Sequence, residues 1–318
     1  MRPRALLLGP HGQLGHDVRR AHAESGETIE LIPLPRDRLD VSREGMVERV
    51  LGELQFDALV NCTAHTRVDE AEDSASAAFA VNAHAVRAMA RVCAAKRARL
   101  LHVSTDYVFG GDHARQSPLR EDDPTAPVNV YGASKAMGET LARLACDDAV
   151  ILRVASLFGV AGTGGGGGNF VETMIRAGRE QGNLRVVDDQ TMSPTATVDV
   201  ARVVIRILAE GCPPGLYHVV NTGPATWFEF AREIVRRAGV EAIVSPCATG
   251  EFAARAERPR YSVLDNAKVT AALGAMPAWQ DALERYLRAR GHAKSRKPER
   301  HRLPGLTRPR GALRRRQK

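Results

Sequence analysis

A tyrosine and a lysine stand four residues apart in the stretch NVYGASKAMGE, residues 129–139. If this stretch is helical, Tyr131 and Lys135 lie one turn apart and project from the same side. A free phenol has a pKa of about 10 and is a poor catalyst at neutral pH, but a nearby ammonium favours the phenolate and lowers that pKa. A lysine can also donate to the hydroxyls of a nicotinamide ribose. The pair could therefore transfer a proton beside a bound nicotinamide.

The residues between them are small: Gly132, Ala133 and Ser134. They would keep this side of the helix slim, so that a flat cofactor could lie against it. The tyrosine–lysine spacing is common by chance, however, and taken alone it is better interpreted as a pair on the protein surface.

The stretch HVSTDYVFG changes this interpretation, because it ends a predicted strand. Open α/β sheets bind ligands at the carboxyl ends of their strands. There Thr105 can donate a hydrogen bond to a carbonyl oxygen, although it could also only cap the turn after the strand. Together Thr105, Tyr131 and Lys135 provide a hydroxyl, a phenol and an ammonium, a set suited to polarising a ketone.

Apolar runs and helical patterns alternate along the first half of the chain. A site at the carboxyl ends of parallel strands requires such an alternation of strands and helices. Strands are expected over residues 4–9, 28–34, 57–64, 99–109 and 149–159, and helices over residues 12–26, 42–54, 74–96 and 131–145. This alternation predicts an α/β fold with a Rossmann-like, doubly wound parallel sheet. Strands of such a sheet are buried on both faces and therefore read as continuous apolar runs.

The alternation weakens after residue 159, where a glycine-rich loop over residues 160–170 comes first. Helices are expected over residues 170–182, 198–211 and 226–239, and a strand over residues 184–190. We interpret this half as containing a smaller α/β substrate-binding lobe. The predicted division gives residues 1–155 and 186–220 to a dinucleotide-binding domain, residues 156–185 and 221–290 to the lobe, and residues 291–318 to a tail.

Three glycines follow the first predicted strand in the order Gly9, Gly12 and Gly15. The turn opens a helix, where free backbone N–H groups and the helix dipole can hold a pyrophosphate. Gly12 would let the backbone approach the phosphates, and Gly15 would let helix and strand pack closely. Glycine turns are common, but this position in a strand–helix–strand unit favours dinucleotide binding.

The end of the second predicted strand reads LIPLPRDRLDVS. An acid commonly stands here to bind the ribose of NAD, but this chain has Pro35 and Arg36, followed by Asp37 and Arg38. An arginine would suit a 2′-phosphate, so this stretch favours NADP over NAD as the cofactor. The alternative is a loop rich in surface charge.

The net charge of +8 lies in the tail, since residues 291–318 hold eleven lysines and arginines and one acid. The remainder of the chain has a net charge of −2. We expect the tail to be a disordered, solvated extension, although such charge could also attract RNA, a membrane or an acidic partner. No specific nucleic-acid binding is expected.

Five scattered cysteines form no CxxC pair, which favours a reducing cytoplasm over a disulfide framework or a zinc site. We expect no metal site, no signal peptide and no membrane span, because no long apolar run occurs.

Several stretches, read together, resemble the extended short-chain dehydrogenase/reductases and, within them, the dTDP-4-dehydrorhamnose reductase family. Besides the glycine turn, STDYVF and YxxxK, they are VNCTAHTRVDEAE, NVYGASKAMGE, GNFVETMIRAG, VVDDQTMSPT, GLYHVVNTGPATWFEFA and RPRYSVLDNAKV. The resemblance covers residues 6–287. It implies NADPH- or NADH-dependent reduction of the 4-keto group of a dTDP-linked 4-keto-6-deoxysugar, and it allows a homodimer.

The resemblance also implies roles for further residues. Those expected to bind the cofactor are Gly12, Gln13, Leu14, Asp40, Val41, Thr63, Ala64 and His65, the last of which could instead be a packed loop histidine. Thr105 and Asp106 would meet the sugar, with Tyr131 as proton donor and Lys135 tuning it.

One position departs from the family. Its members usually read RTSWVYG where this chain reads RVASLFG, so Ser156 stands at the position of a tryptophan that touches the sugar. The loss of that ring removes a stacking surface and opens space. We therefore hypothesise a sugar from a specialised deoxysugar pathway, unless Phe158 turns in to fill the gap.

Two other functions stay open. An epimerase or dehydratase of the same superfamily would keep the three polar groups, and Asp106 partly matches the acid that a dehydratase needs. A non-catalytic regulatory subunit, like the one that accompanies methionine adenosyltransferase, would not need Thr105, Tyr131 and Lys135 intact.

Overall fold

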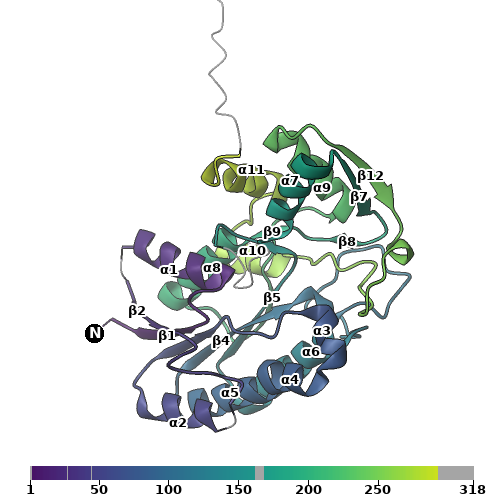
Figure 1. Ribbon diagram of the computed structural model, residues 1–318. Helices are drawn as coiled ribbons and strands as arrows, with labels where there is room; N and C mark the ends of the chain where they lie inside the picture. Colours follow the sequence, from purple (N-terminus) through teal and green to yellow (C-terminus); the bar gives the residue numbers. More distant parts are fainter. Residues whose placement is uncertain (1, 27, 44, 162–167, 293–318) are drawn as a thin grey trace, which may run out of the picture.

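Six strands form the central sheet of the computed structural model, which describes residues 2–26, 28–43, 45–161 and 168–292 (Figure 1). Every neighbouring pair runs parallel, which confirms the predicted doubly wound sheet. The edge strand β2 (Glu30–Leu34) contains Pro33. In spatial order the strands are β10 (Gly215–His218), β5 (Ala149–Val154), β4 (Arg99–Thr105), β3 (Ala58–Asn61), β1 (Arg4–Leu8) and β2 (Glu30–Leu34).

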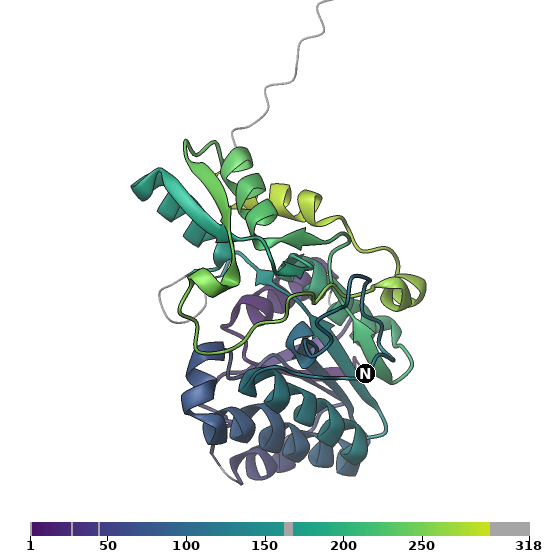
Figure 2. The same cartoon turned by 90° about the vertical axis from the view of Figure 1, so that its right-hand side faces the viewer.

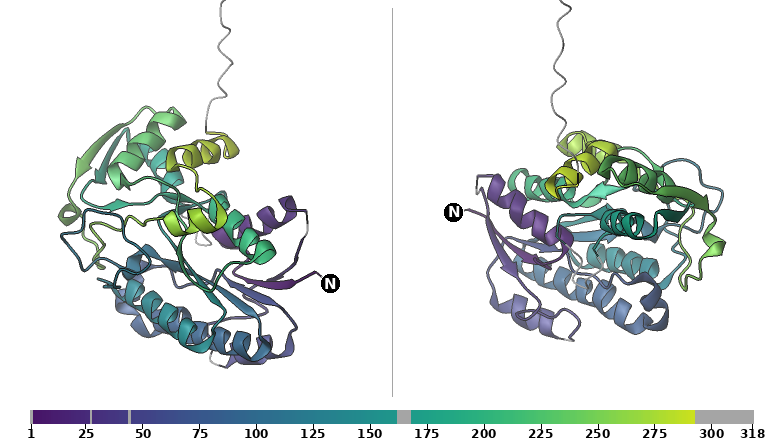
Figure 3. Two further views of the ribbon diagram at one scale, coloured as in Figure 1. Left: turned by 180° about the vertical axis from the view of Figure 1, so that it is seen from behind. Right: turned by 45° about the horizontal axis from the view of Figure 1, so that its top comes forward.

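Helices cover both faces of this sheet (Figure 3). One apolar cluster joins the strands to α1 (Gln13–Glu24), α8 (Thr197–Glu210) and α10 (Ala267–Leu273). A second cluster joins them to α2 (Met46–Glu53), α5 (Ala85–Lys96) and α6 (Val130–Ala145). Both faces of the inner strands are thus largely buried, which explains their unbroken apolar runs, whereas Glu30 and Pro33 of the edge strand β2 are exposed. The structure places α10 on the sheet, although its residues fall within the range predicted for the lobe.

A smaller lobe lies beyond one end of the sheet (Figures 1 and 2). Its helices and main strand pair are α7 (Phe170–Gln181), α9 (Trp227–Ala238), α11 (Trp279–Ala289), β7 (Asn183–Val187) and β12 (Ile243–Cys247). Two short pairs complete it: β6 (Leu157–Phe158) with β9 (Thr195–Ala196), and β8 (Thr191–Met192) with β11 (Ala225–Thr226). After the 3-10 turn η3 (Thr249–Glu251), the chain runs across the junction of lobe and sheet to α10, as Figure 2 shows.

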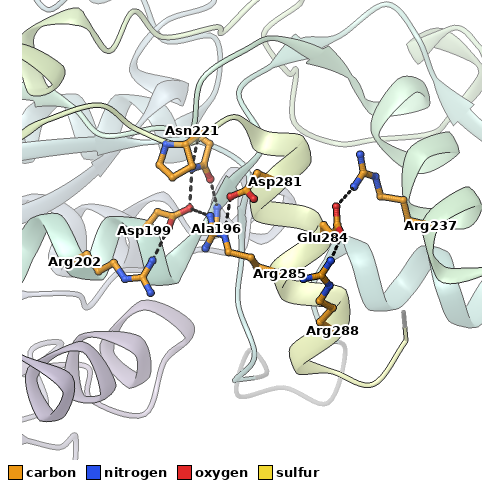
Figure 4. Close-up of polar contacts among 10 residues, drawn as sticks. Ala196, Asp199, Arg202, Asn221, Arg237, Asp281, Glu284, Arg285 and Arg288 are labelled. Carbon is orange, nitrogen blue, oxygen red and sulfur yellow. Dashed lines mark hydrogen bonds and ion pairs between the residues drawn. The ribbon is translucent and has the colours of Figure 1, made fainter. Parts of the chain in front are cut away.

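A buried carboxylate ties the two parts together (Figure 4). Asp199 on α8 is 3% exposed and accepts hydrogen bonds from Asn221 Nδ2 at 2.8 Å and from Arg285 Nη2 on α11 at 2.7 Å. Arg202 adds a third contact, at 3.4 Å. Charge-assisted bonds to a buried carboxylate are strong and directional. They fix α11 of the lobe against α8 of the sheet.

The helix predicted over residues 74–96 is interrupted. The structure has α3 (Val68–Asp73), α4 (Ala75–Phe79), a π-helical turn η1 (Ala80–His84) and then α5. Such turns are often found at functional sites, and this one carries the buried Asn82 toward the site described below.

Two expected features lie outside the described residues: nearly all of the basic tail and most of the glycine-rich loop. Within the described ranges, no helix is long and apolar enough to cross a membrane. In the same part of the chain, no group of three or more histidine, cysteine, aspartate and glutamate side chains could hold a metal ion.

Candidate active site

The three glycines of the first turn have different surroundings. Gly9 adopts a left-handed φ of +72°, and a Cβ there would lie 3.1 Å from the Cys62 carbonyl. A Cβ on Gly15 would lie 2.1 Å from Gly9 O, so any side chain would push α1 off the turn. Gly12 has room, because a Cβ there would meet only Gly9 O, at 3.5 Å. Gly15 thus serves packing, while Gly12 leaves a space above the helix end.

That helix end suits a pyrophosphate. Gly12 is the N-cap of α1, no side chain caps the helix, and its first turn has no acid. Its free N–H groups and positive dipole end are the features that bind phosphates. Two buried polar atoms at this edge have no partner, Gln13 Oε1 and His65 Nδ1. Buried polar atoms are normally satisfied, so they fit a polar ligand such as a dinucleotide. Leu14 points into the core, and only its backbone can contribute.

The loop after β2 brings a cation and an acid together. Arg36 Nη2 lies 3.3 Å from Asp40 Oδ2, and the arginine side chain is 82% exposed. The Ser42 hydroxyl, 2.6 Å from Asp40 Oδ1, lowers the pKa of Asp40 below its ordinary value. Val41 packs on the second cluster of the sheet. The exposed guanidinium can therefore meet a phosphate at the adenine end.

The segment after β3 is held by two asparagines. Asn61 Oδ1 accepts from the backbone N and the hydroxyl of Thr63, at 3.0 and 2.6 Å. Asn82, on the π-helical turn, accepts from His65 N at 2.9 Å and donates to His65 O at 3.1 Å. The backbone from Thr63 through Ala64 to His65 is thus fixed beside the glycine turn.

At the end of β4, Thr105 and Asp106 join a residue that is distant in sequence. The Thr105 hydroxyl donates to Asp106 Oδ1 at 3.1 Å, and the Ser262 hydroxyl donates to Asp106 Oδ2 at 2.6 Å. Asp106 is 2% exposed, and this burial raises its pKa to about 6, against the opposing effect of both hydroxyls. The segment that crosses from the lobe is thereby joined to the predicted catalytic threonine.

The phenol and the amine lie on α6, in the first two turns of the helix. Asn129 caps α6 by accepting from Gly132 N at 2.7 Å, which fixes where the helix begins. The Tyr131 ring packs edge-on against Tyr107, with the centroids 5.8 Å apart. Lys135 is 2% exposed; its Nζ donates to Val103 O at 2.6 Å and lies 3.4 Å from His102 Nε2.

The electrostatics of this pair differ from the prediction. Burial raises the pKa of Tyr131 to about 12, and a hydrogen bond with Thr105 opposes the shift only in part. Burial also lowers the pKa of Lys135 to about 8, with Glu139 acting in the opposite direction. The expected lowering of the tyrosine pKa is therefore wrong for the protein alone, because desolvation of the phenol is the largest effect and Asp106 acts in the same direction. A phenol that stays protonated at neutral pH is suited to donating its proton.

Two of the three small residues between Tyr131 and Lys135 face neighbouring protein and not a cofactor, which corrects the expectation of a slim cofactor-binding face for Gly132 and Ser134. A Cβ on Gly132 would lie 2.1 Å from Tyr107 O, and a Cβ on Gly138, one turn beyond Lys135, would lie 2.1 Å from Asn82 O. Ser134 is fully buried and accepts from Asn82 Nδ2 at 3.0 Å. The slim face of α6 is filled by neighbouring protein backbone.

Ser156 lies in the turn between β5 and β6, in a left-handed conformation with φ +43°. Its carbonyl accepts from Thr195 N at 3.3 Å. Phe158 does not fill the space that a tryptophan would take, because it is 1% exposed and packs in the lobe core. Its ring centroid lies 5.5 Å from that of Tyr286 and 5.6 Å from that of Phe230.

Sequence reasoning missed two residues of this site, Asn82 and Ser262. Asn82 stands in the alanine-rich stretch AAFAVNAHAVRAMA, and a lone asparagine there is a signal that could have drawn attention to it. Nothing in the spacing of the sequence connects Ser262 with Asp106, 156 positions away.

Comparisons with known proteins place similar chains among reductases of dTDP-linked sugars. A family profile described as "RmlD substrate binding domain" matches residues 3–291. A dTDP-4-dehydrorhamnose reductase of Streptomyces griseus is 40% identical over 289 residues, which are 89% of this chain and 92% of that protein. A probable dTDP-4,6-dihydroxy-2-methyloxan-3-one 4-ketoreductase of Streptomyces antibioticus is 38% identical, over 88% of this chain and 93% of that protein.

A solved structure leads to the same group of proteins. The dTDP-4-dehydrorhamnose reductase of Bacillus anthracis, crystallised with NADP, is 35% identical and superposes with a TM-score of 0.83. The match covers 91% of this chain and all of that one. The sheet, the glycine turn and the polar groups at the carboxyl ends of its strands thus belong to a known group of enzymes. The chain is a member of the dTDP-4-dehydrorhamnose reductase family.

Proposed function

We propose that this protein reduces the 4-keto group of a dTDP-linked 4-keto-6-deoxysugar with NADPH, and less readily with NADH. The observation that carries the proposal is the placement of the Tyr131 phenol beside the Thr105 hydroxyl, at the carboxyl end of β4, in a chain of this reductase family. When bound, the nicotinamide would supply the hydride. Thr105 stabilises the developing oxyanion, and Tyr131 gives its proton to the alkoxide.

The direct test is oxidation of NADPH, followed by absorbance, with dTDP-4-dehydrorhamnose and other dTDP-4-keto-6-deoxysugars as substrates. NMR of the product gives the configuration at C4. Turnover on at least one of these sugars is expected. No oxidation with any of them, for protein that still binds NADPH, would favour the regulatory subunit instead.

Two glycine substitutions should separate cofactor binding from folding. Gly12→Ala adds a methyl group that the protein itself can accept, so the melting temperature should stay near that of wild type while NADPH binding weakens by about tenfold or more. Gly15→Ala forces a clash with Gly9 O and should cost about 1–3 kcal/mol of folding stability. Thermal melts and fluorescence titration with NADPH measure the two effects. Equal losses of stability would contradict the separate roles.

We further propose that Ser156 widens the sugar pocket. Ser156→Trp should shift preference toward dTDP-4-dehydrorhamnose by about 10–200-fold in the ratio of kcat/KM values, which is the range for one pocket side chain. Phe158 is held in the lobe core, so it cannot compensate. Ser156→Asn is the matched control, because asparagine tolerates the left-handed backbone without adding a ring. An unchanged ratio in the tryptophan variant would leave an ordinary rhamnose-pathway substrate as the better assignment.

We also propose that the enzyme works in the cytoplasm and forms a homodimer. Met137 and Leu144 support the second point, since they are 45% and 79% exposed on the outer face of α6. Interfaces bury contiguous apolar surface, and these two side chains lie two helical turns apart on the same side of α6. Light scattering of the purified protein tests it, and a monomeric mass at high concentration would overturn it.

A further inference from the structure

A chain of buried polar groups runs beneath the proposed active site, across three neighbouring elements. Asn61 at the end of β3 contacts His102 in β4, with 3.0 Å between Asn61 Nδ2 and His102 Nδ1. On its other side, His102 Nε2 lies 3.4 Å from Lys135 Nζ on α6. Asn61 and His102 are fully buried, and Lys135 is 2% exposed. Water therefore cannot rearrange to suit these groups, and their donors and acceptors must match one another.

The orientation of the Asn61 amide follows from a single backbone contact. Thr63 N donates to the Asn61 side chain at 3.0 Å, and a backbone N–H can only donate. The atom facing Thr63 is therefore the amide oxygen, so the NH₂ group faces His102. Since an amide NH₂ can only donate, His102 Nδ1 must accept.

This fixes the tautomer of the imidazole. Burial lowers the pKa of His102 well below its ordinary value, so the ring is neutral. A neutral imidazole that accepts at Nδ1 carries its hydrogen on Nε2. That N–H points at Lys135 Nζ, which in turn donates to Val103 O at 2.6 Å.

An ammonium at Lys135 would present a second donor to this N–H, whereas a neutral amine would offer a lone pair. We propose that Asn61 and His102 act as positioning residues that make the ammonium of Lys135 less stable relative to its neutral amine. Both forms are then accessible, so that Lys135 can release a proton and take one up during turnover. The role in turnover rests on the proposed function. After Tyr131 has given its proton to the sugar alkoxide, an ammonium at Lys135 can return one proton to the phenolate. The resulting neutral amine then takes up one proton from bulk solvent, which is the proton that the reduction consumes overall.

The other titratable groups around Lys135 act in the opposite direction or are neutral. Glu139, on the same helix, favours the ammonium, but Arg153 of β5 binds this carboxylate with Nη2 and Oε2 2.7 Å apart. Cys62, directly after β3, stays a thiol, because burial raises its pKa to about 12. Burial has the largest effect on the pKa of Lys135. His102 of β4 is the buried neighbour that contacts Nζ itself, so its hydrogen-bonding state adds to that effect.

The variant Asn61→Asp tests the proposal with almost no change of shape. A carboxylate still accepts from Thr63, but it would also accept from His102 Nδ1. The imidazole hydrogen should then move to Nδ1 and leave Nε2 to accept from an ammonium. NMR of the ¹⁵N-histidine-labelled protein should show hydrogen on Nε2 in wild type and on Nδ1 in N61D. The same tautomer in both proteins would overturn the proposal.

The pKa of Lys135 is the second readout, and it needs no substrate. Titration of ¹³Cε-labelled lysine is practical, because the chain has few lysines, and Lys135→Met identifies the resonance. The lysines of the chain are Lys96, Lys135, Lys268, Lys294, Lys297 and Lys318. Wild type should titrate below the ordinary lysine pKa, and N61D should raise the value by about one unit or more.

The double variant N61D/H102F separates the tautomer from the new charge. It keeps the carboxylate and removes the imidazole, so the rise in the Lys135 pKa should be clearly smaller than in N61D. An equal rise would show that charge alone acts and would overturn the proposal. If the double variant does not fold, the comparison of the His102 tautomer in wild type and N61D still tests the proposal. Absence of reductase activity would count against the proposed function only, since neither NMR measurement depends on turnover.

Discussion

Replacing Tyr131 with phenylalanine should lower kcat by about 10²–10⁴-fold, the usual contribution of a positioned general acid. The ring would still pack against Tyr107, so folding and NADPH binding should change little. Only the transferable proton is lost. Burial keeps the pKa of this phenol at about 12, so in the protein alone the proton is in place across the neutral range.

Steady-state kinetics together with NADPH titration measure this effect. Tyr217→Phe is the matched control, because it removes a phenol that donates to Pro213 O at 2.9 Å, in the turn before β10. Turnover of the control should stay close to wild type. Activity of Tyr131→Phe within about threefold of wild type would remove Tyr131 from the role of proton donor.

A second large effect is expected from Glu139→Gln, on stability. Glu139 and Arg153 are 4% and 3% exposed and form a two-point ion pair, with contacts of 2.9 Å to Nε and 2.7 Å to Nη2. Removing one charge leaves the buried guanidinium uncompensated, which costs about 3–5 kcal/mol of the free energy of unfolding. Urea denaturation at neutral pH measures the loss.

An exposed pair provides the control for this prediction. Glu210 and Arg206, one turn apart on α8, have side chains 53% and 44% exposed, so Glu210→Gln should have little effect. The double variant E139Q/R153M should recover much of the loss, since it removes both buried charges together. A loss from Glu139→Gln no larger than that from Glu210→Gln would show that Arg153 finds another partner, such as the nearby His218.

The fold could be predicted well from the sequence, because its signals are local. Continuous apolar runs mark strands buried on two faces, and the runs between them carry helical spacing. The helix over residues 74–96 shows where such signals end. Its pattern is helical throughout, and the π-helical turn at Ala80–His84 brings Asn82 to the loop of His65 through contacts that no local spacing encodes.

The site could be predicted only where its residues are close in the sequence. Tyr131 and Lys135 share a helix, so their spacing alone predicts that they project together. The direction of their pKa shifts was not predictable, since it depends on burial by distant segments such as the strand that carries His102. Ser262 could not be found for the same reason: its hydrogen bond to Asp106 spans 156 positions.

The edge strand β2 bears on how this protein behaves when it is concentrated. Glu30 N donates to Pro3 O at 2.8 Å, on the side of β1, so alternate residues such as Leu31 and Pro33 direct their backbone groups outward. A proline has no N–H to offer. A strand of another molecule would find a gap in the ladder at this position, and edge strands without such a gap are templates for fibrils. Replacing Pro33 with valine would therefore restore a donor and make the free edge more prone to aggregation.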